Sequence, residues 1–351
     1  MKNGEYKFIE VPLEDYDALY NASAVLKNTP FVTPEWLKFI ADAKNVSIHI
    51  LKVLDQRGND LGFLFFGIFK MGPFRLAASP YYGWDSETMG PALNVASPQE
   101  NLLKEASKYI RSTYRTSLVQ FSVVEGSPCF LSNGAIRSES FTSPVVEIDK
   151  EEEALLSGFR KDVKKNVRFF AKNGGVFKLL VPDRDTCSLY YDMTLDVYRR
   201  RGIKPPYTRE FIERMFDADL EAYRKGRCLA LGAFDNEGKC IAISVTMIYG
   251  EEATGQCFSV YQSGLALHPM EPLFWRRIQE LKARGVKRFD LMGEADYKNK
   301  FRPEHRKVVR YYFGSKLLLW LQIKAKSFLL ERRRKKERKT KAARKKESNA
   351  C

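Results

Sequence analysis

The segment DLMGEADYKNKF at residues 290–301 gathers residue types that can polarise a carbonyl group and accept a proton. A predicted strand brings Asp290 near its end, a glycine permits a tight turn, and Tyr297, Lys298 and Phe301 follow in a short helix or turn. A lysine held just past a strand end can stabilise a developing oxyanion or a phosphate. An ordinary loop anchored by Phe301 is the alternative interpretation.

A second candidate is the helix predicted around FRKDVKKNVRFF at 159–170. Apolar residues recur there at helical spacing and predict a buried stripe. Cations form a second stripe, which can attract phosphate-bearing substrates, although a plainly solvated face is also possible. The cationic stripe consists of Arg160, Lys164 and Arg168, widened by Lys161, Lys165 and Lys172.

The segment YQSGLALHPMEPLFWRR at 261–277 begins with Tyr261 and leads into a helix predicted to start near Glu271. Free N–H groups at a helix start bind anions, but Glu271 itself partly fills that role. His268 in the preceding loop is a candidate general base, and an incidental loop histidine is the more common case.

The loop SPYYGWDSE at 79–87 is rich in tyrosine and charge. Exposed Tyr82 and Trp84 beside acidic residues are typical of clefts that bind sugars or peptides. Local packing explains such residues equally well.

The predicted elements that position these residues fall into two blocks with the same order: strand, helices, antiparallel hairpin, helix, strand. The second block starts near residue 141. In the first block the expected strands are 6–11, 46–54, 63–69 and 118–124, with helices at 15–26, from Thr33-Pro34, and behind a capping box at Ser97–Glu100. In the second, strands are expected at 144–149, 228–234, 243–249, 256–261 and 287–292, and helices at 151–172, 184–201, 208–225 and 271–284.

Two polar turns occupy the same place in the two blocks. DQRGNDLG at 55–62 and DNEGKCIA at 235–242 share aspartate at the first place, glycine at the fourth and an aliphatic residue at the seventh. Such turns are common, but their matching positions favour an internal duplication. The pattern lacks strict strand–helix alternation, GxGxxG and GxxxxGK[ST], which argues against nicotinamide and P-loop chemistry.

The charge of the chain is concentrated at one end. The 351 residues carry a formal net charge of +16, and residues 331–351 hold eleven lysines and arginines against three glutamates, a net of +8. We expect a cytoplasmic protein, because no secretory h-region or membrane-spanning run is visible. Six cysteines without a CxxC pair and three scattered histidines predict neither a disulfide framework nor a metal centre.

Three segments together resemble the FemAB-like branch of the GNAT acyltransferases. They are FVTPEWLKFIADA, FRKDVKKNVRFFAKNGG before a strand, and GVKRFDLMGEADYKNKF, and they span residues 31–301. The resemblance implies an α/β (α+β) fold of two tandem GNAT-like domains, each a mixed, mainly antiparallel sheet flanked by helices. We place these domains at 1–140 and 141–314, the second being catalytic, with a basic helical tail at 315–351.

The resemblance also implies an acyltransferase that acts by direct attack of an amino group on a bound acyl donor. The acceptor would be a cell-envelope sugar or its nucleotide- or lipid-linked precursor, and the donor acyl-CoA, such as acetyl-CoA. The usual GNAT pyrophosphate loop is missing, because LALHPMEPLFWRR occupies its place. An aminoacyl-tRNA-dependent transferase of the peptidoglycan-bridge type and a non-catalytic membrane- or assembly-binding module are the alternatives.

The roles implied by the resemblance centre on Lys298, which would stabilise charge on the acyl carbonyl or a phosphate. Asp290 or Glu294 would accept the amine proton, although Asp290 can equally be a buried support of the loop. Tyr297 and Phe301 would shape the pocket. The residues expected to contact the polyanionic donor or the acceptor are Arg160, Lys164, Arg168, Tyr261, Tyr82 and Trp84, and no metal is expected.

The tail combines an apolar-rich helix predicted at 315–330 with an almost entirely cationic continuation at 331–346. Trp320, Phe328 and Leu329 beside cations are typical of a helix that lies on anionic lipid, at the inner face of the cell membrane. Contact with nucleic acid such as tRNA, and a merely solubilising end, are the two other interpretations.

Overall fold

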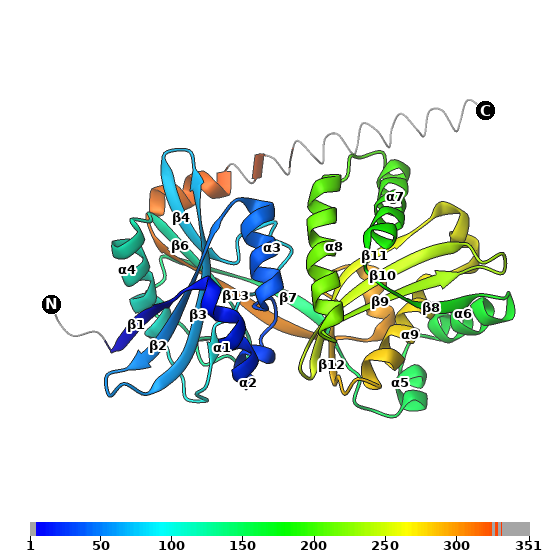
Figure 1. The fold of residues 1–351 in the computed structure, drawn as a ribbon, viewed down its shortest axis with the longest axis horizontal. Coiled ribbons are helices and arrows are strands. Elements are labelled where there is room, and N and C mark those ends of the chain that lie inside the picture. The colour runs from blue at the N-terminus through cyan, green and yellow to red at the C-terminus, as the bar shows by residue number, and fades with distance from the viewer. Residues whose placement is uncertain (1–4, 325–326, 329–330, 332–351) are drawn as a thin grey trace. The chain divides into compact units, whose positions relative to one another are not determined.

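The computed structural model describes residues 5–324, 327–328 and 331 (Figure 1). Contacts divide the chain into two compact units, and each is described by itself. The first unit consists of Met1–Glu151, Met247–Gln256 and Leu281–Lys316, and the second of Glu152–Thr246, Cys257–Glu280 and Leu317–Cys351. The boundary predicted at residue 140 falls inside a strand of the first unit.

The first unit is built on a mostly antiparallel sheet. Its strands are hydrogen-bonded in the order β1-β2-β3-β4-β6-β13-β7-β12-β11, and short β5 pairs with β3. The strands are β1 (Tyr6–Val11), β2 (Ser47–Asp55), β3 (Asp60–Met71), β4 (Phe74–Ser79), β5 (Ala92–Leu93), β6 (Leu118–Val124), β7 (Arg137–Glu147), β12 (Arg288–Asp290), β13 (Glu304–Gly314) and the first half of β11 (Glu252–Val260). The helices are η1 (Leu13–Asp15), α1 (Tyr16–Ala22), α2 (Ala24–Lys27), α3 (Pro34–Lys44), α4 (Leu102–Tyr114) and η3 (Asp296–Phe301).

Helices cover both faces of this sheet, because alternate strand residues are apolar on each side (Figure 1). On one face α4 buries Leu103, Ala106 and Ile110 against the strands. On the other face lie α1 and α3, where the Tyr16 ring meets Phe65 edge-on at 5.7 Å. Helix α3 begins as predicted, since the Thr33 hydroxyl accepts the backbone N–H of Trp36 at 3.3 Å.

The strands of the second unit are hydrogen-bonded in the order β11-β10-β9-β8. Its elements are α5 (Glu152–Gly158), α6 (Lys161–Lys172), β8 (Val176–Leu180), α7 (Arg184–Arg201), α8 (Arg209–Arg224), β9 (Cys228–Phe234), β10 (Cys240–Tyr249), η2 (Gln262–Leu267) and α9 (Met270–Lys282). Helix α8 packs on α7 and on β9. The hairpin strands β9 and β10 are almost entirely buried.

The two matching turns have the same hydrogen bonds. Asp55 Oδ1 accepts the N–H groups of Arg57 and Asn59, both at 2.8 Å. Asp235 Oδ1 accepts those of Glu237 and Lys239, at 3.1 and 2.9 Å. In both turns the glycine at the fourth place has a positive φ, of 87° and 79°. This identity of geometry supports the duplication predicted from the sequence.

The two copies of the duplicated strand order differ in where their last strands pair. The first copy has the order β1-β2-β3-β4-β6-β13, and the second has the order β8-β9-β10-β11-β12-β7. In each series the fourth and fifth strands are parallel and a helix precedes the fifth, namely α4 or α9. The last strand of each series is antiparallel to the fifth, but β7 joins β12 and β13 joins β6. The two halves have therefore exchanged their last strands.

Several local predictions need correction. The helix predicted at 151–172 is two helices, because Arg160 has extended backbone angles between α5 and α6. The capping box at Ser97–Glu100 was wrong: α4 begins at Leu102, and Gln99 donates to Ser97 instead. Strand β13 was not predicted. In the tail, residues 316–324, 327–328 and 331 are helical, and the rest of the predicted helix lies outside the described residues.

Candidate functional site

One face of the sheet at β11, β12, β7 and β13 is polar. The backbone register places Arg288 directly opposite both Glu252 and Glu147, and Arg306 opposite Ser143. Side chains alternate along a strand, so these residues share one face and their sequence neighbours share the other. The opposite face holds Val146, Phe289 and Ala253, which are all buried.

Arginines and carboxylates on this face form a connected network. Arg306 binds Asp290 at 2.8 Å and Glu252 at 3.2 Å. Glu252 also binds Arg288, at 2.7 Å. Asp290 is only 6% exposed, and its Oδ1 accepts the Ser143 hydroxyl at 2.5 Å. Burial lowers the pKa of Arg306, but the two carboxylates outweigh this and raise it. Asp290 thus supports the loop, one of the two roles considered for it from the sequence.

The loop after β12 is held by hydrogen bonds to its own backbone. Asp290 Oδ1 accepts the Met292 N–H at 2.8 Å. The Lys298 ammonium donates to the carbonyls of Leu291 and Gly293, both at 2.8 Å, and to that of Met292. Lys298 also lies 5.7 Å from the centre of the Tyr297 ring. The predicted lysine therefore closes the loop around three carbonyl oxygens, and its role in the reaction stays a prediction.

A second carboxyl group meets the same loop from the N-terminal part of the chain. Glu87 Oε1 accepts the Gly293 N–H at 2.6 Å. Burial, reinforced by repulsion from Asp290, raises the pKa of Glu87. Glu294, the other predicted proton acceptor, accepts the Thr142 hydroxyl and lies 3.6 Å from His305.

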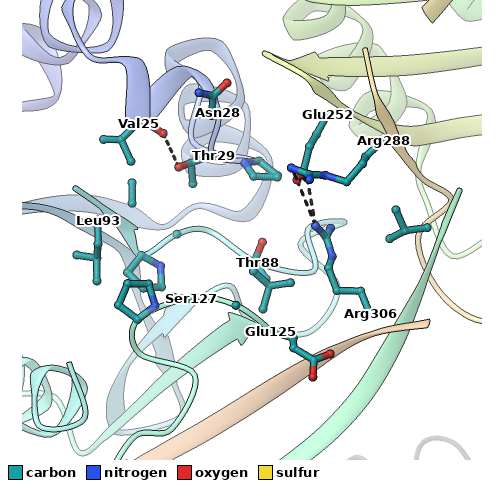
Figure 2. Close-up of a pocket in the computed structure, with 18 of the residues that line it drawn as sticks. Val25, Asn28, Thr29, Thr88, Leu93, Glu125, Ser127, Glu252, Arg288 and Arg306 are labelled. Atoms are coloured by element: carbon teal, nitrogen blue, oxygen red, sulfur yellow. Dashed lines mark hydrogen bonds and ion pairs between the residues drawn. The ribbon is translucent and has the colours of Figure 1, made fainter. Parts of the chain in front are cut away.

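A cavity of about 540 Å³ opens beside this network, and all its lining residues belong to the first unit (Figure 2). We call it the acidic cavity, because its lining contains four glutamates against two arginines and one histidine. Both arginines are bound to Glu252. Within the described part of the chain, Glu147 and Glu304 form no ion pair. Burial raises the pKa of Glu147, although Arg288 partly opposes this. The ionisable lining residues are Glu125, Glu147, Glu252, Glu304, Arg288, Arg306 and His305.

Apart from Glu125, the remaining wall of the acidic cavity is small and neutral. It comes from the end of α2 and the turn after it, from β5 and the segment before it, and from the turn that follows β6. Figure 2 shows Thr29, Thr88 and Ser127 on this side, facing Arg306 and Glu252. The Thr29 hydroxyl donates to the Val25 carbonyl at 2.7 Å. A cavity lined by several carboxylates and by hydroxyl groups suits a polar, cationic guest.

In the second unit, α6 carries the predicted cations. Arg160 precedes the helix and lies 3.4 Å from Asp162, while Lys164 and Arg168 follow along it. Phe169 of the same helix meets the His268 ring at 5.8 Å. The basic helix therefore packs near the loop that leads into α9.

The segment in place of a glycine-rich phosphate loop is the 3-10 helix η2. Its start is held by Asp196, which accepts the Gln262 N–H at 2.8 Å. Gly264 is closely packed, since an added Cβ would lie 2.6 Å from the Ile241 Cβ. Tyr261 precedes η2, with the Lys239 ammonium 6.0 Å from the centre of its ring.

The structure brings some predicted residues together within one unit. Lys298, Tyr297, Asp290 and Phe301 all lie at the loop after β12, and Phe301 is buried.

Tyr82 is 58% exposed, whereas Trp84 is buried. The Trp84 ring packs against Gly67, where an added Cβ would come within 2.4 Å of it.

Sequence reasoning missed the residues of the polar sheet face: Ser143, Glu147, Glu252, Arg288 and Arg306. A signal was present in β12, where Arg288 and Asp290 alternate with buried Phe289. Polar residues at every second place of a strand indicate a face that does not pack into the core.

Comparison with known proteins agrees with this architecture. Residues 157–299 match the acetyltransferase (GNAT) domain family. Within these residues the chain is similar to a GNAT acetyltransferase domain. No curated protein matches the sequence.

Solved structures resemble the chain over most of its length. FemX aligns with a TM-score of 0.66 at 12% identity, covering 90% of this chain and 99% of that one. L-PGS from Bacillus licheniformis aligns with a TM-score of 0.51 at 14% identity, covering 89% of this chain and 94% of that one. The C-terminal domain of a putative lysylphosphatidylglycerol synthetase from Agrobacterium fabrum aligns with a TM-score of 0.54 at 14% identity, covering 86% of this chain and 96% of that one.

These likenesses establish the fold, and with the GNAT domain they confirm the predicted resemblance to the FemAB-like branch and the predicted fold class. The GNAT domain spans α6 to most of η3 and therefore includes the basic helix, the parallel pair β11/β12 and Lys298. No described helix is both long and apolar enough to span a bilayer. Among the described residues, no three His, Cys, Asp or Glu side chains are grouped as metal ligands.

Proposed function

We propose that this chain is an N-acyltransferase whose acceptor amine binds in the acidic cavity. The observation that carries the proposal is the carboxylate excess of that cavity. Glu147 and Glu304 line it and pair with no cation among the residues that the structure describes, while both arginines are bound to Glu252. A protonated amine would be attracted to these two carboxylates, whereas an anionic group would be repelled.

Attack on an acyl group requires the amine to lose its proton. Glu147 is the best-placed base among the cavity carboxylates, because burial raises its pKa toward the range in which a carboxylate accepts protons from an amine. In the proposed reaction the amine nitrogen bonds to the acyl carbon and the bond from that carbon to the leaving sulfur or oxygen breaks. Glu147 takes one proton from the ammonium group before the attack. The second proton, lost as the amide forms, passes to the leaving sulfur or oxygen, which departs as a thiol or hydroxyl group. No covalent acyl-enzyme is needed.

The loop after β12 supplies the second part of the proposed site. Arg306 joins the acidic cavity to this loop, since it contacts both Glu252 and Asp290. Lys298 sets the position of the carbonyls at 291–293 and would place positive charge beside the acyl oxygen, with Tyr297 at its side. Asp290 acts by holding Arg306 and the loop in place.

The proposed substrates follow from amine recognition and from the cations of the GNAT domain. We assign the acceptor to an amino sugar of the cell envelope or its nucleotide- or lipid-linked precursor. Acyl-CoA is the proposed donor, because the matched domain is that of an acetyltransferase. Arg160, Lys164 and Arg168 would meet the phosphates of the donor or of a nucleotide-linked acceptor.

An aminoacyl-tRNA is the second candidate donor, and one observation favours it. Closely packed η2 replaces the glycine-rich phosphate loop, while α6 and its N-cap residue present six cations within Arg160–Lys172. A run of cations suits the many phosphates of an RNA better than those of one coenzyme. The likeness to a putative lysylphosphatidylglycerol synthetase, whose name specifies an aminoacylated product, agrees with this candidate.

The test compares both donors with one acceptor panel. The full chain is incubated with radiolabelled acetyl-CoA or with charged tRNA and a set of amino sugars, free and nucleotide-linked, and the amide product is identified by mass spectrometry. Glu147→Gln should lower kcat about a hundredfold or more and remove the acidic limb of the pH profile. Glu14→Gln, an exposed carboxylate on η1, is the matched control.

The outcomes separate the candidates. Product from acetyl-CoA supports the first donor, and product from charged tRNA supports the second. Full activity in Glu147→Gln would refute its role as base. Absence of product and of any donor binding would instead indicate a non-catalytic binding module.

A further inference from the structure

We propose that the helix beginning at residue 316 docks the protein on an anionic membrane surface. The helix presents an exposed apolar stripe, formed by Leu317, Trp320, Leu321 and Phe328, whose side chains are 42–66% exposed. At 3.6 residues per turn these positions fall within about a third of the helix circumference. They lie on the same side of the helix as Lys324.

The orientation of this stripe is set by the other side of the helix. Leu318 and Leu319 are buried. Their directions lie roughly opposite the centre of the stripe, since each residue advances by about 100°. The helix is therefore buried on one side and exposes the stripe on the other.

The chemistry of the stripe suits the interface of a bilayer rather than its core. Lys316 precedes the stripe, and the Lys324 ammonium lies 5.8 Å from the centre of the Trp320 ring. No described helix could span a bilayer. Tryptophan and leucine beside lysine characterise helices that lie in the headgroup region.

Charge selects the lipid. Residues 331–351 carry a net charge of +8 in the sequence, and 332–351 lie outside the described residues. Each lysine or arginine near an anionic leaflet contributes about 1 kcal/mol, so the segment that follows the stripe strengthens binding to anionic lipid.

The net charge of +8 beside the stripe argues against two other binding partners for it, a second copy of the chain and an RNA. A second copy of the chain would bring another +8 segment next to the first and be repelled. An RNA would need cations but would leave the leucines of the stripe in water. An anionic bilayer offers both an apolar layer for the stripe and negative charge for the cations.

This inference goes beyond the proposed function, because it concerns where the protein resides and not which bond it forms. Lipid-linked acceptors would be reached from such a position. The vesicle experiment below measures binding without any substrate, so its failure and the failure of the acyl-transfer proposal are separate results.

The test uses the full chain and sedimented vesicles of phosphatidylcholine alone or mixed equally with phosphatidylglycerol. We expect binding to the mixed vesicles, weakened by salt, and little binding to phosphatidylcholine. Trp320→Ser with Leu321→Ser should weaken binding by about tenfold or more. Leu131→Ser, which removes an exposed leucine of the first unit, should change nothing.

A charge series tests the second half of the proposal. Replacing Arg332, Arg333 and Arg334 with glutamine should weaken binding on the order of tenfold or more. The same change at Lys38, Lys108 and Arg111 removes equal charge from exposed positions of α3 and α4 and should have little effect. Equal losses in both triple variants would overturn the assignment to the tail.

Fluorescence locates the contact. Of the four tryptophans, Trp36, Trp84 and Trp275 are buried and Trp320 is 54% exposed. Lipids with brominated acyl chains should quench the wild-type chain and not Trp320→Phe. Quenching that persists in Trp320→Phe would overturn the proposal, and so would absence of vesicle binding by the wild-type chain. The proposal would also fail if the stripe variant lost self-association or tRNA binding while the wild-type chain did not bind vesicles.

Discussion

Removal of the Arg306 guanidinium should destabilise the first unit. Arg306 lies between the carboxylates of Asp290 and Glu252, and its side chain is 24% exposed. Breaking a buried ion pair from one side costs about 3–5 kcal/mol, because the remaining charge is buried without its partner. The partial exposure of Arg306 and the second cation on Glu252, Arg288, place Arg306→Met near the lower end, at about 3 kcal/mol.

Urea and thermal unfolding followed by circular dichroism measure this loss. For a domain of roughly 150–250 residues, about 3 kcal/mol corresponds to a fall in Tm of roughly 6–12 °C. Arg209→Met on α8 is the matched control, because its guanidinium is 56% exposed and its ion pair with Glu213 should contribute less than about 1 kcal/mol.

A double-mutant cycle shows whether the stranded carboxylate causes the effect. Adding Asp290→Asn to Arg306→Met removes the buried charge that the first change leaves behind, so the double variant should lose less than the sum of the single losses. A loss in Arg306→Met no larger than in Arg209→Met, or strictly additive losses in the cycle, would refute the reasoning.

Three further predictions concern the same unit. The raised pKa of Glu87 means that the folded chain holds a proton that the unfolded chain releases, so stability falls as pH rises from the ordinary glutamate pKa through the raised value. Glu87→Gln should remove that slope in urea titrations at a series of pH values, and an unchanged slope would contradict the assignment. Gly67→Ala should cost about 1–3 kcal/mol, because the new Cβ would lie 2.4 Å from the Trp84 ring, whereas Gly158→Ala meets open space; equal Tm values for the two variants would contradict this. Lys298→Met should raise the hydrogen exchange of backbone amides in the loop after β12 and lower transfer activity; activity lost with unchanged exchange would show that the lysine does not act by holding the loop.

The local elements were largely predictable from the sequence. Helix α7 and strand β9 have the predicted bounds, 184–201 and 228–234, because their periodicity and caps are encoded nearby. The Thr33 cap behaved as predicted, whereas the box at Ser97–Glu100 did not. A cap signal specifies a helix start only when the following residues adopt helical angles.

The candidate site was predictable only at its loop. Lys298 and Asp290 stand in one short segment with a strand end and a glycine, so the sequence placed them together. Glu147, Glu252 and Arg306 come from three strands separated by long stretches of chain. Their juxtaposition depends on strand register, and a shift of one residue would turn each side chain to the opposite face.

What the sequence by itself determined is the repeated order of elements, the two equivalent turns and the concentration of charge at the C-terminal end. These features depend on residues that are neighbours along the chain. What only the tertiary structure decided is that β7 pairs with β12 and β13 with β6, so that each half receives its last strand from the other. The physical reason is that a backbone edge offers the same N–H and C=O groups to any strand, and packing of the whole unit selects the partner. That choice puts Glu147, Arg288, Glu252 and Arg306 on one sheet face and so forms the acidic cavity.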